Sequence, residues 1–415
     1  MLYCSRYEQL TERPLACFGG RAKRLAIHLF RVRHTFYAVF VGKAVSGGKE
    51  FHRFCCGVIL MKQFFYPLSA FILSLILTEV VIILSNRFKW YDKVNGRKIH
   101  TGNIPRLGGV GFVLSFFILS AVFFPVHGFH VIKYLPLLIG SSVIFIFGVL
   151  DDFINIPAKL KLFIQSVSAL IVVAGGFSFS VLGPWKLGYA GPVISFLWLL
   201  GCINAFNLID GMDALCGGLS TFILLTYALI CASFNPHFSI VVLILAASVA
   251  GFLVYNKPTA KIFMGDGGSQ FLGFVIAALP LLDFPPHIEY NKILIAAVMA
   301  SIPLFDTLAA VWRRTRERRS FFTADRAHIH HKLMNLGYDV KGILAILYAI
   351  QFFLCVMALI AVWFKYSRGT AVLVAALCAM SIFFSLIHFT NRAVKAKEEN
   401  TSRAKNTKKK TKTSE

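Results

Sequence analysis

The chain has 415 residues, of which 57% are hydrophobic and 15% charged, and its formal net charge is +24. This composition is too apolar for a soluble domain of this length. Membrane topology and the two terminal segments account for most of the basic excess, and no binding module is visible, so the composition disfavours a nucleic-acid-binding protein. The nine cysteines include no CxxC pair, which argues against a zinc site or a disulfide framework.

Residues 1–60 carry ten lysines and arginines and lack the apolar core of a signal peptide. Eleven spans would place this basic segment outside the cell, against the usual charge bias. We therefore interpret residues 1–60 as an extension outside the membrane domain. We hypothesise that translation begins at Met61, just before the apolar stretch FFYPLSAFILSLIL.

Eleven apolar segments follow, and all except the eighth, which is short and contains Pro280, are close to the roughly 20 residues that a transmembrane helix needs. They lie at 64–86, 108–126, 134–150, 160–179, 191–209, 215–233, 238–255, 269–283, 292–312, 342–364 and 369–390. Backbone groups must be paired inside a bilayer, so the segments are predicted to be helices. The sequence therefore predicts an all-α polytopic integral membrane protein with about 11 transmembrane helices, spanning a domain at 61–390.

The loops that alternate with the C-terminus hold 27 lysines and arginines, whereas the opposite loops hold 5. This bias predicts a cytoplasmic C-terminus. Residues 391–415 are lysine-rich and of low complexity, so we expect a basic, disordered cytoplasmic tail that contacts membrane lipids.

Acidic residues stand at the ends of several predicted spans, on the side assigned to the cytoplasm. They are Asp151, Asp152, Asp210, Asp213 and Asp266, with Asp306 near the same face. Acids gathered at one membrane face are functional candidates. Converging carboxylates suit Mg²⁺, with Mn²⁺ as an alternative ion. The structural alternative is solvated helix ends or ion pairs with nearby arginines.

Two glycine-containing segments surround these acids. In INAFNLIDGMDALCGG, residues 203–218, four polar residues recur at spacings of three and are expected on one helical face: Asn204, Asn207, Asp210 and Asp213. In KIFMGDGGSQFLG, residues 261–273, Asp266 lies among glycines before a helix start, an arrangement that exposes backbone N–H groups to an anion. Either segment alone is a weak signal.

Two basic loops lie on the same predicted side. The loop at 93–109 contains Arg97, Lys98, His100 and Arg106, and the loop at 313–341 contains Arg326, His328, His330 and His331. Such groups can bind a diphosphate and sugar hydroxyls. The arginines at 313–319 fit a positive-inside anchor, and the histidines show no HExxH zinc pattern.

Five motifs in order resemble the polyprenyl-phosphate N-acetylhexosamine-1-phosphate transferases. They are RKIH with PRLGG, LDD, NAFNLIDGMDAL, FMGDGGSQFLG and DRAHIHHKL. The likeness runs from about residue 64 to 390 and is greatest for the bacterial undecaprenyl-phosphate N-acetylglucosamine-1-phosphate transferases. Residues 1–60 and the tail lie outside it.

The resemblance implies a Mg²⁺-dependent reaction at the cytoplasmic face of the bacterial inner membrane. UDP-N-acetylglucosamine would give its sugar phosphate to undecaprenyl phosphate and release UMP, which starts the synthesis of a cell-envelope glycan. A homodimer is left open.

The resemblance also implies roles for individual residues. Asp151, Asp152, Asp210 and Asp213 would be catalytic, and Asp266, Asp151 and Asp152 would be the metal ligands. Substrates would be bound by the remaining positions, Arg97, Lys98, His100, Asn204, Asn207, Arg326, His328, His330 and His331.

The chain departs from the family pattern at two places. Ala214 stands where a glycine is frequent, and Ser320-Phe321-Phe322 replaces a Pro-Phe pair. Three alternatives stay open: the transferase of UDP-N-acetylmuramoyl-pentapeptide, another UDP-N-acetylhexosamine as donor, and a membrane transporter. The lack of internal repeats disfavours the transporter.

Overall fold

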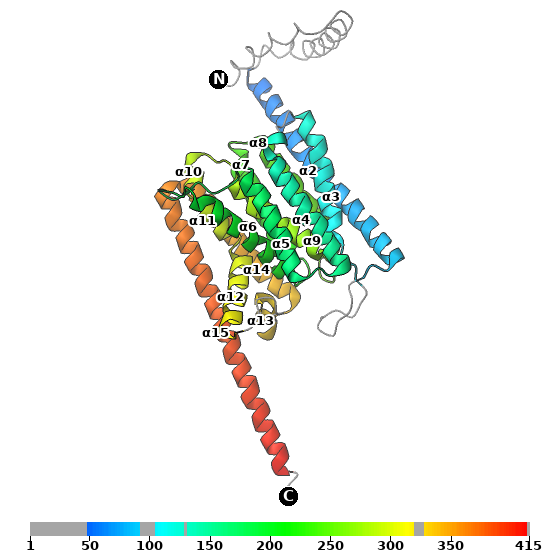
Figure 1. Cartoon of the computed structure of the whole chain (residues 1–415), viewed down its shortest axis with the longest axis vertical. Coiled ribbons are helices and arrows are strands. Elements are labelled where there is room, and N and C mark those ends of the chain that lie inside the picture. Colours follow the sequence, from blue (N-terminus) through cyan, green and yellow to red (C-terminus); the bar gives the residue numbers. More distant parts are fainter. Residues whose placement is uncertain (1–47, 92–103, 128–130, 319–327, 413–415) are drawn as a thin grey trace, which may run out of the picture. The chain divides into compact units, whose positions relative to one another are not determined.

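The computed structural model describes the backbone of residues 48–91, 104–127, 131–318 and 328–412, and side chains among these within 64–394. The chain forms two compact units, Met1–Phe64 and Phe65–Glu415. Residues 1–47 lie outside the described residues, and the structure does not test whether translation begins at Met61, so the extension and the start site remain predictions. The second unit is a bundle of helices (Figure 1).

Helices account for nearly all the described elements, and the sequence prediction of an all-α membrane protein is confirmed at that level. The longer helices are α2 (Gly48–Phe88), α3 (Gly108–Val126), α4 (Leu135–Ile154), α5 (Ala158–Ala174), α6 (Ala190–Ile209), α7 (Leu215–Ala232), α8 (Pro236–Asn256), α9 (Gly265–Ala278), α12 (Ser301–Arg316), α14 (Val340–Phe364) and α15 (Tyr366–Lys412). The shorter ones are η2 (Val131–Tyr134), η3 (Leu279–Leu281), α10 (Pro286–Glu289), α11 (Lys292–Met299) and α13 (Ile329–Asn335). One small antiparallel hairpin joins β1 (Val181–Leu182) to β2 (Trp185–Lys186).

Eight of the described helices are long and apolar enough to cross a membrane, and α11 with α12 makes a ninth if this pair, bent by 76°, counts as one span. The expected count of eleven is therefore not confirmed. The expected spans at 160–179 and 269–283 correspond to α5, with 17 residues, and α9, with 14. Gly175 and Gly176 follow the end of α5, and Pro280 lies in the 3-10 turn after α9, so both helices stop early.

Helix α9 forms the centre of the bundle, where it packs against α3, α4, α6 and α7. Its start approaches two other helices so closely that side chains would not fit. A Cβ on Gly148 of α4 would lie 2.6 Å from the Cα of Gly267, and a Cβ on Gly109 of α3 would lie 2.5 Å from the Cα of Gly268. The start of α9 is therefore held directly against the last turns of α4 and the first turn of α3.

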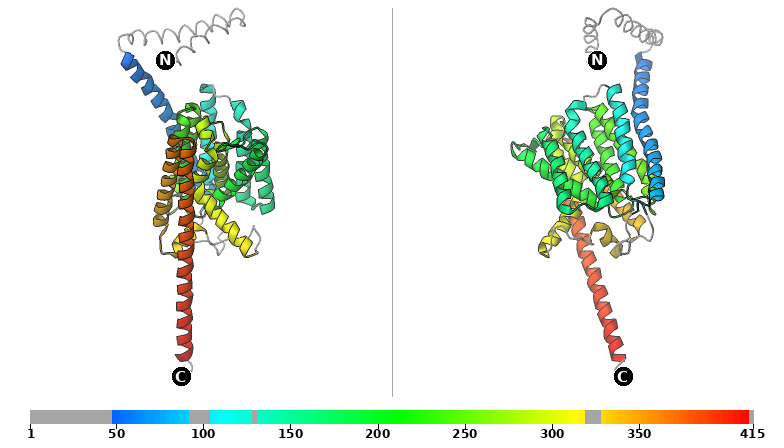
Figure 2. Two further views of the ribbon diagram at one scale, coloured as in Figure 1. Left: turned by 90° about the vertical axis from the view of Figure 1, so that its left-hand side faces the viewer. Right: turned by 45° about the vertical axis from the view of Figure 1, so that its right-hand side comes forward.

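The directions of these helices define two ends of the bundle. At one end, which we call the acidic end because Asp152 and Asp266 lie there, helices α4, α6 and α8 finish and helices α3, α7 and α9 begin. At the opposite end, α3 and α7 finish and α4 and α8 begin. Figure 2 shows α14 and α15 running side by side. Helix α15 continues to Lys412, which differs from the disordered tail predicted for 391–415. The segment is rich in lysine, which favours helix, and it contains no proline or glycine.

Candidate functional site

Asp152, in the last turn of α4, is bonded to the backbone at the start of α9. Its Oδ1 accepts the N–H of Asp266 at 2.9 Å, and its Oδ2 accepts the N–H of Gly267 at 3.1 Å. The side chain is only 2% exposed. Both oxygens satisfy N–H groups that have no partner inside α9, at the positive end of the helix dipole. Asp152 therefore anchors the turn that carries Asp266.

Gly265 makes this turn possible. Its φ of +77° is unfavourable for other residues, and a Cβ would collide with the Arg106 carbonyl oxygen and lie 2.5 Å from the Asp152 carboxylate. The glycine motif thus serves the close approach of α9 to α4. The N–H groups that we expected to face an anion donate to the Asp152 carboxylate, so they are not available to a substrate phosphate.

Asp151 is also buried, with an exposed fraction of 3%. Its Oδ1 accepts the N–H of Ile156 at 2.6 Å, which fixes the chain as it leaves α4 through Asn155 in the left-handed conformation. Its Oδ2 forms an ion pair with the ammonium of Lys161 on α5.

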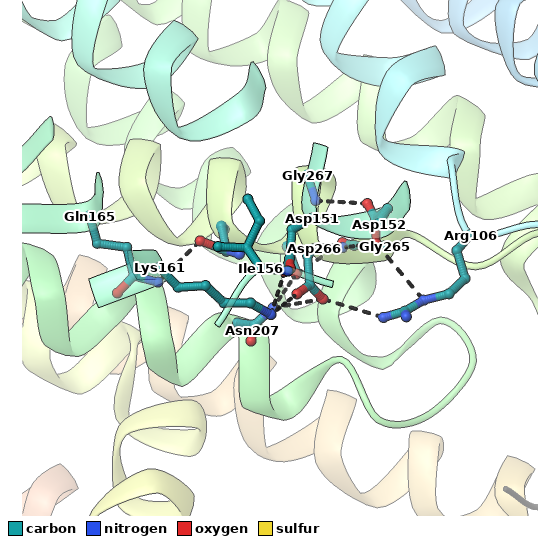
Figure 3. A network of polar contacts seen from close by, with 12 residues as sticks. Arg106, Asp151, Asp152, Ile156, Lys161, Gln165, Asn207, Gly265, Asp266 and Gly267 are labelled. Carbon is teal, nitrogen blue, oxygen red and sulfur yellow. Dashed lines mark hydrogen bonds and ion pairs between the residues drawn. The ribbon is translucent and has the colours of Figure 1, made fainter. Parts of the chain in front are cut away.

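Asp266 is the point where the polar groups converge (Figure 3). Lys161 lies 3.0 Å from Oδ2, while the Arg106 guanidinium lies 3.4 Å and the Asn207 amide 3.3 Å from Oδ1. Burial alone would raise the pKa of Asp266, but the contact with Asp151 and the charges of Lys161 and Arg106 lower the pKa to about 2. Asp266 is therefore ionised at neutral pH.

Asp210 and Asp213 do not share the helical face predicted for them. Helix α6 ends at Ile209, so Asp210 is its C-cap and Asp213 lies in the following turn. Asp213 accepts the N–H of Ala260 at 3.0 Å and so holds the loop after α8. Burial and the nearby charge of Asp266 raise the pKa of Asp210 well above its ordinary value. Within the described residues, no hydrogen bond or ion pair to the Asp210 carboxylate is seen.

The two asparagines do face the same way from α6. Asn207 donates to Asp266 and, at 3.0 Å, to the Ser269 hydroxyl, whereas Asn204 donates to Gln165 at 2.9 Å. Gln165 in turn donates to Gln270 at 3.1 Å. Asn204 thus belongs to a buried amide network that joins α5, α6 and α9 below the acids, and Asn207 belongs to the site itself.

Asp306 on α12 organises the histidines. Its Oδ2 lies 2.8 Å from His328 Nδ1, and its Oδ1 accepts the N–H of Ile329 at 2.8 Å. The side chain therefore fixes the start of α13 together with the imidazole orientation of His328. The sequence alone assigned no role to this acid.

His330 connects the histidine motif to the turn that contains Asp210. Its ring packs against Gly211, beside Asp210, where a Cβ would lie 2.9 Å from the imidazole. Burial and the nearby His331 lower the pKa of His330 to about 3, so its ring is neutral. The His331 ring lies 4.2 Å from the His330 ring. The histidine motif and the Asp210 turn thus form one wall.

Several predicted residues meet and others cannot be placed. The structure brings together Asp151, Asp152, Asp266 and Asn207, and it joins His330 to the Asp210 turn. Arg97, Lys98, His100 and Arg326 lie outside the described residues. Sequence reasoning missed Lys161, although a lysine ten residues after Asp151, at the start of the next helix, was a usable signal.

The donor set partly fits a metal ion. Carboxylate oxygens suit Mg²⁺, and Asp266 is the most exposed of the three predicted ligands, at 17%. Asp152 uses both oxygens on backbone N–H groups, whereas Asp151 uses one and Asp266 contacts side chains, so Asp266 and Asp151 are the better candidates. Among the described residues, no group of three or more metal-binding side chains is close enough to hold an ion, and the Lys161 ammonium contacts both Asp151 and Asp266.

Known proteins share this sequence over most of its length. The glycosyl transferase family 4 model matches residues 134–282. A probable undecaprenyl-phosphate N-acetylglucosaminyl 1-phosphate transferase of Bacillus subtilis is 34% identical over 303 residues, 70% of this chain and 84% of that protein. The decaprenyl-phosphate N-acetylglucosaminephosphotransferase of Mycobacterium leprae is 31% identical, covering 70% and 82%.

A third relative extends the range of organisms. The undecaprenyl-phosphate alpha-N-acetylglucosaminyl 1-phosphate transferase of Salmonella typhi is 31% identical over 296 residues, 66% of this chain and 78% of that protein. Identity at this level over two thirds of the chain agrees with the five motifs and with the converging acids. The chain therefore belongs to glycosyl transferase family 4, as a multi-pass membrane enzyme of the polyprenyl-phosphate N-acetylhexosamine-1-phosphate transferase group.

Proposed function

We propose that the protein transfers N-acetylglucosamine 1-phosphate from UDP-N-acetylglucosamine to undecaprenyl phosphate and releases UMP. A lipid phosphate oxygen attacks the sugar-bearing phosphorus of the donor. A new P–O–P bond forms, the bond to the UMP phosphate breaks, and UMP carries away the electron pair. The observation that carries this proposal is the meeting of Asp151, Asp152 and Asp266 with Lys161 and Arg106 at the ends of membrane helices.

The two cations address the main difficulty of the reaction, which is that both substrates are anions. Lys161 and Arg106 are about one-third exposed, so each can contact a phosphate while it remains near Asp266. The guanidinium is suited to bidentate phosphate contacts, and the ammonium sits on a flexible stem. Mg²⁺, held by Asp266 and Asp151, would reduce the negative charge of the diphosphate.

Asp210 is the acid best suited to contact the donor. It precedes Gly211, which contacts the His330 ring, and it is near enough to Asp266 for that charge to raise its pKa together with burial, which favours hydrogen-bond donation to the donor. The lipid phosphate is largely ionised at neutral pH, so the attack does not require a general base. Asp152 acts by positioning, because both its oxygens hold the turn that carries Asp266.

The charge bias of the loops supports the orientation that we propose, and the bacterial relatives support the choice of membrane. We place the protein in the bacterial cytoplasmic membrane, with the acidic end and the C-terminus in the cytoplasm. The acceptor's hydrocarbon chain then lies in the bilayer while its phosphate reaches the acids at the membrane edge.

The test uses purified full-length protein, Mg²⁺, undecaprenyl phosphate and separately labelled UDP-N-acetylglucosamine and UDP-N-acetylgalactosamine. We expect lipid-linked label and UMP from the first donor only, and loss of both with a chelator. Asp266→Asn should be inactive. Asp283→Asn, the same change at an exposed site on the opposite end, should keep the wild-type rate.

Other outcomes would redirect or end the proposal. Label from the second donor alone would change the substrate but keep the chemistry. Transfer only from UDP-N-acetylmuramoyl-pentapeptide would move the protein to peptidoglycan synthesis. A folded protein that is inactive with all three donors would refute the proposal.

A further inference from the structure

Two adjoining cavities lie at the opposite end of the bundle, away from the acids. The outer cavity, of about 110 Å³, is lined in part by Lys133, Asn235 and Asp283. The inner cavity, of about 80 Å³, is lined by apolar side chains apart from Ser141 and the Tyr134 hydroxyl. Tyr134, Phe238 and Leu282 line both cavities. The charged mouth of the outer cavity and the apolar inner cavity therefore share part of one wall.

The inner cavity is closed toward the acids. Phe271 lies on α9 between Asp266 and the cavity, and its ring is surrounded by those of Phe112, Phe116 and Phe145 at 6.1 to 6.4 Å. Both Phe112 and Phe271 are completely buried. Protein interiors packed in this way leave no passage for a hydrocarbon chain. A ligand of the inner cavity therefore comes from the opposite end or from the surrounding bilayer.

The charges at the mouth indicate the chemical class of that ligand. Lys133 Nζ lies 2.9 Å from Asp283 Oδ2, and the two side chains are 56% and 87% exposed. An anionic headgroup at Lys133 would face the carboxylate, and a cationic headgroup at Asp283 would face the ammonium. A zwitterionic headgroup places each of its charges beside the opposite charge of this pair.

We propose that the two cavities bind a zwitterionic phospholipid from the leaflet at this end of the bundle. The phosphate lies beside Lys133 and the headgroup ammonium beside Asp283, while a segment of one acyl chain occupies the inner cavity. Such a cavity stays dry and accepts apolar groups, because its walls offer water few partners. Its volume admits a segment of the chain and not the whole chain. The proposal does not depend on the reaction at the acidic end.

The experiment is native mass spectrometry of the full-length protein in detergent. Phosphatidylethanolamine and phosphatidylglycerol with identical acyl chains are added in equal amounts, so that only the headgroups differ. We expect the first lipid to be bound about threefold more than the second, as fits one exposed ion pair. Equal binding of the two lipids by the wild-type protein would overturn the proposal.

Two charge variants test the mouth. Asp283→Asn should abolish the preference, and Lys133→Gln should lower the binding of both lipids. Lys186→Gln, which removes an exposed lysine outside the cavities, is the matched control and should behave as wild type. An unchanged preference in both mouth variants would refute the assigned headgroup contacts.

A third variant tests the inner cavity. Ala278→Phe adds a ring to its wall and should reduce the binding of both lipids without changing their ratio. If that variant does not fold, the two charge variants still decide. Displacement of the bound phospholipid by undecaprenyl phosphate in the wild-type protein would overturn the proposal and assign the cavities to the acceptor chain.

Discussion

Asp152→Asn should damage the fold as well as the reaction, unlike a change at an ordinary ligand. Asp152 accepts N–H groups at 2.9 and 3.1 Å, and its side chain is 2% exposed. Asparagine has the same shape but only one acceptor oxygen. Its amide NH₂ would face the second backbone N–H, so two donors would meet at a buried position where neither can find another acceptor.

The magnitude follows from the two bonds. A hydrogen bond to a charged group contributes about 1.5–3 kcal/mol, and a buried N–H without a partner costs about 1–3 kcal/mol. The oxygen that remains keeps one neutral bond. We expect the free energy of unfolding to fall by about 3 kcal/mol, which corresponds to a melting temperature about 4 °C lower for a unit of this size.

Asp266→Asn is the matched variant. Each side chain that contacts Asp266 also has another polar partner. Lys161 contacts Asp151, Arg106 contacts Asp152, and Asn207 contacts Ser269. The loss of stability should stay below about 1 kcal/mol while transfer activity is lost. Thermal unfolding in detergent, measured beside the transferase assay, separates the two effects. An unchanged melting temperature for Asp152→Asn would show that its carboxylate serves a ligand and not the turn.

Three further predictions concern the histidine wall and the turn beside it. Ala214 has a φ of +61°, so Ala214→Gly should raise the free energy of unfolding by about 1 kcal/mol in denaturant titrations. His330 has a pKa of about 3 in the folded protein, so between pH 6.5 and 3 only the unfolded chain gains this proton. Acidification from pH 7 to pH 5 should therefore cost about 2 kcal/mol of stability in wild type and less in His330→Gln, as thermal scans at both pH values will show. Asp306→Asn should lower kcat/KM for the UDP-sugar about tenfold, because His328 loses its orienting partner; an unchanged value would refute that role.

The sequence predicted the members of the site better than their positions. The aspartate pair, Asp266 and the histidine motif carry signals in local sequence, namely acids at span ends and glycines before a helix. The prediction that Asp213 shares a helical face with Asn204 and Asn207 was wrong. Residues spaced by three lie on one face only as long as the helix continues. Helix α6 ends at Ile209, and Asp213 turns to the loop at Ala260. The contact of Lys161 with Asp266 could not be predicted because the two residues are 105 positions apart, whereas its pairing with Asp151 could have been inferred from the chain.

The membrane spans show a similar limit. Hydropathy finds apolar segments, and it located the eight long helices within a few residues. It does not distinguish a segment that faces lipid from one that is buried in protein. Helix α9 is apolar because α3, α4, α6 and α7 enclose it, and 14 residues suffice for that purpose.

The long chain separation between Asp152 and the turn of α9 has a consequence for biosynthesis. The N–H of Asp266 is made 114 residues after Asp152. At typical rates of translation, roughly 5–20 residues per second, the acids at the end of α4 must wait on the order of 6–20 s for that partner. Lys161 is made with the very next helix. During that interval Asp151 can already pair with Lys161, and Asp152 can pair with Arg106, which is made before it. A nascent chain that lacks Lys161 would hold Asp151 without a partner at the membrane edge.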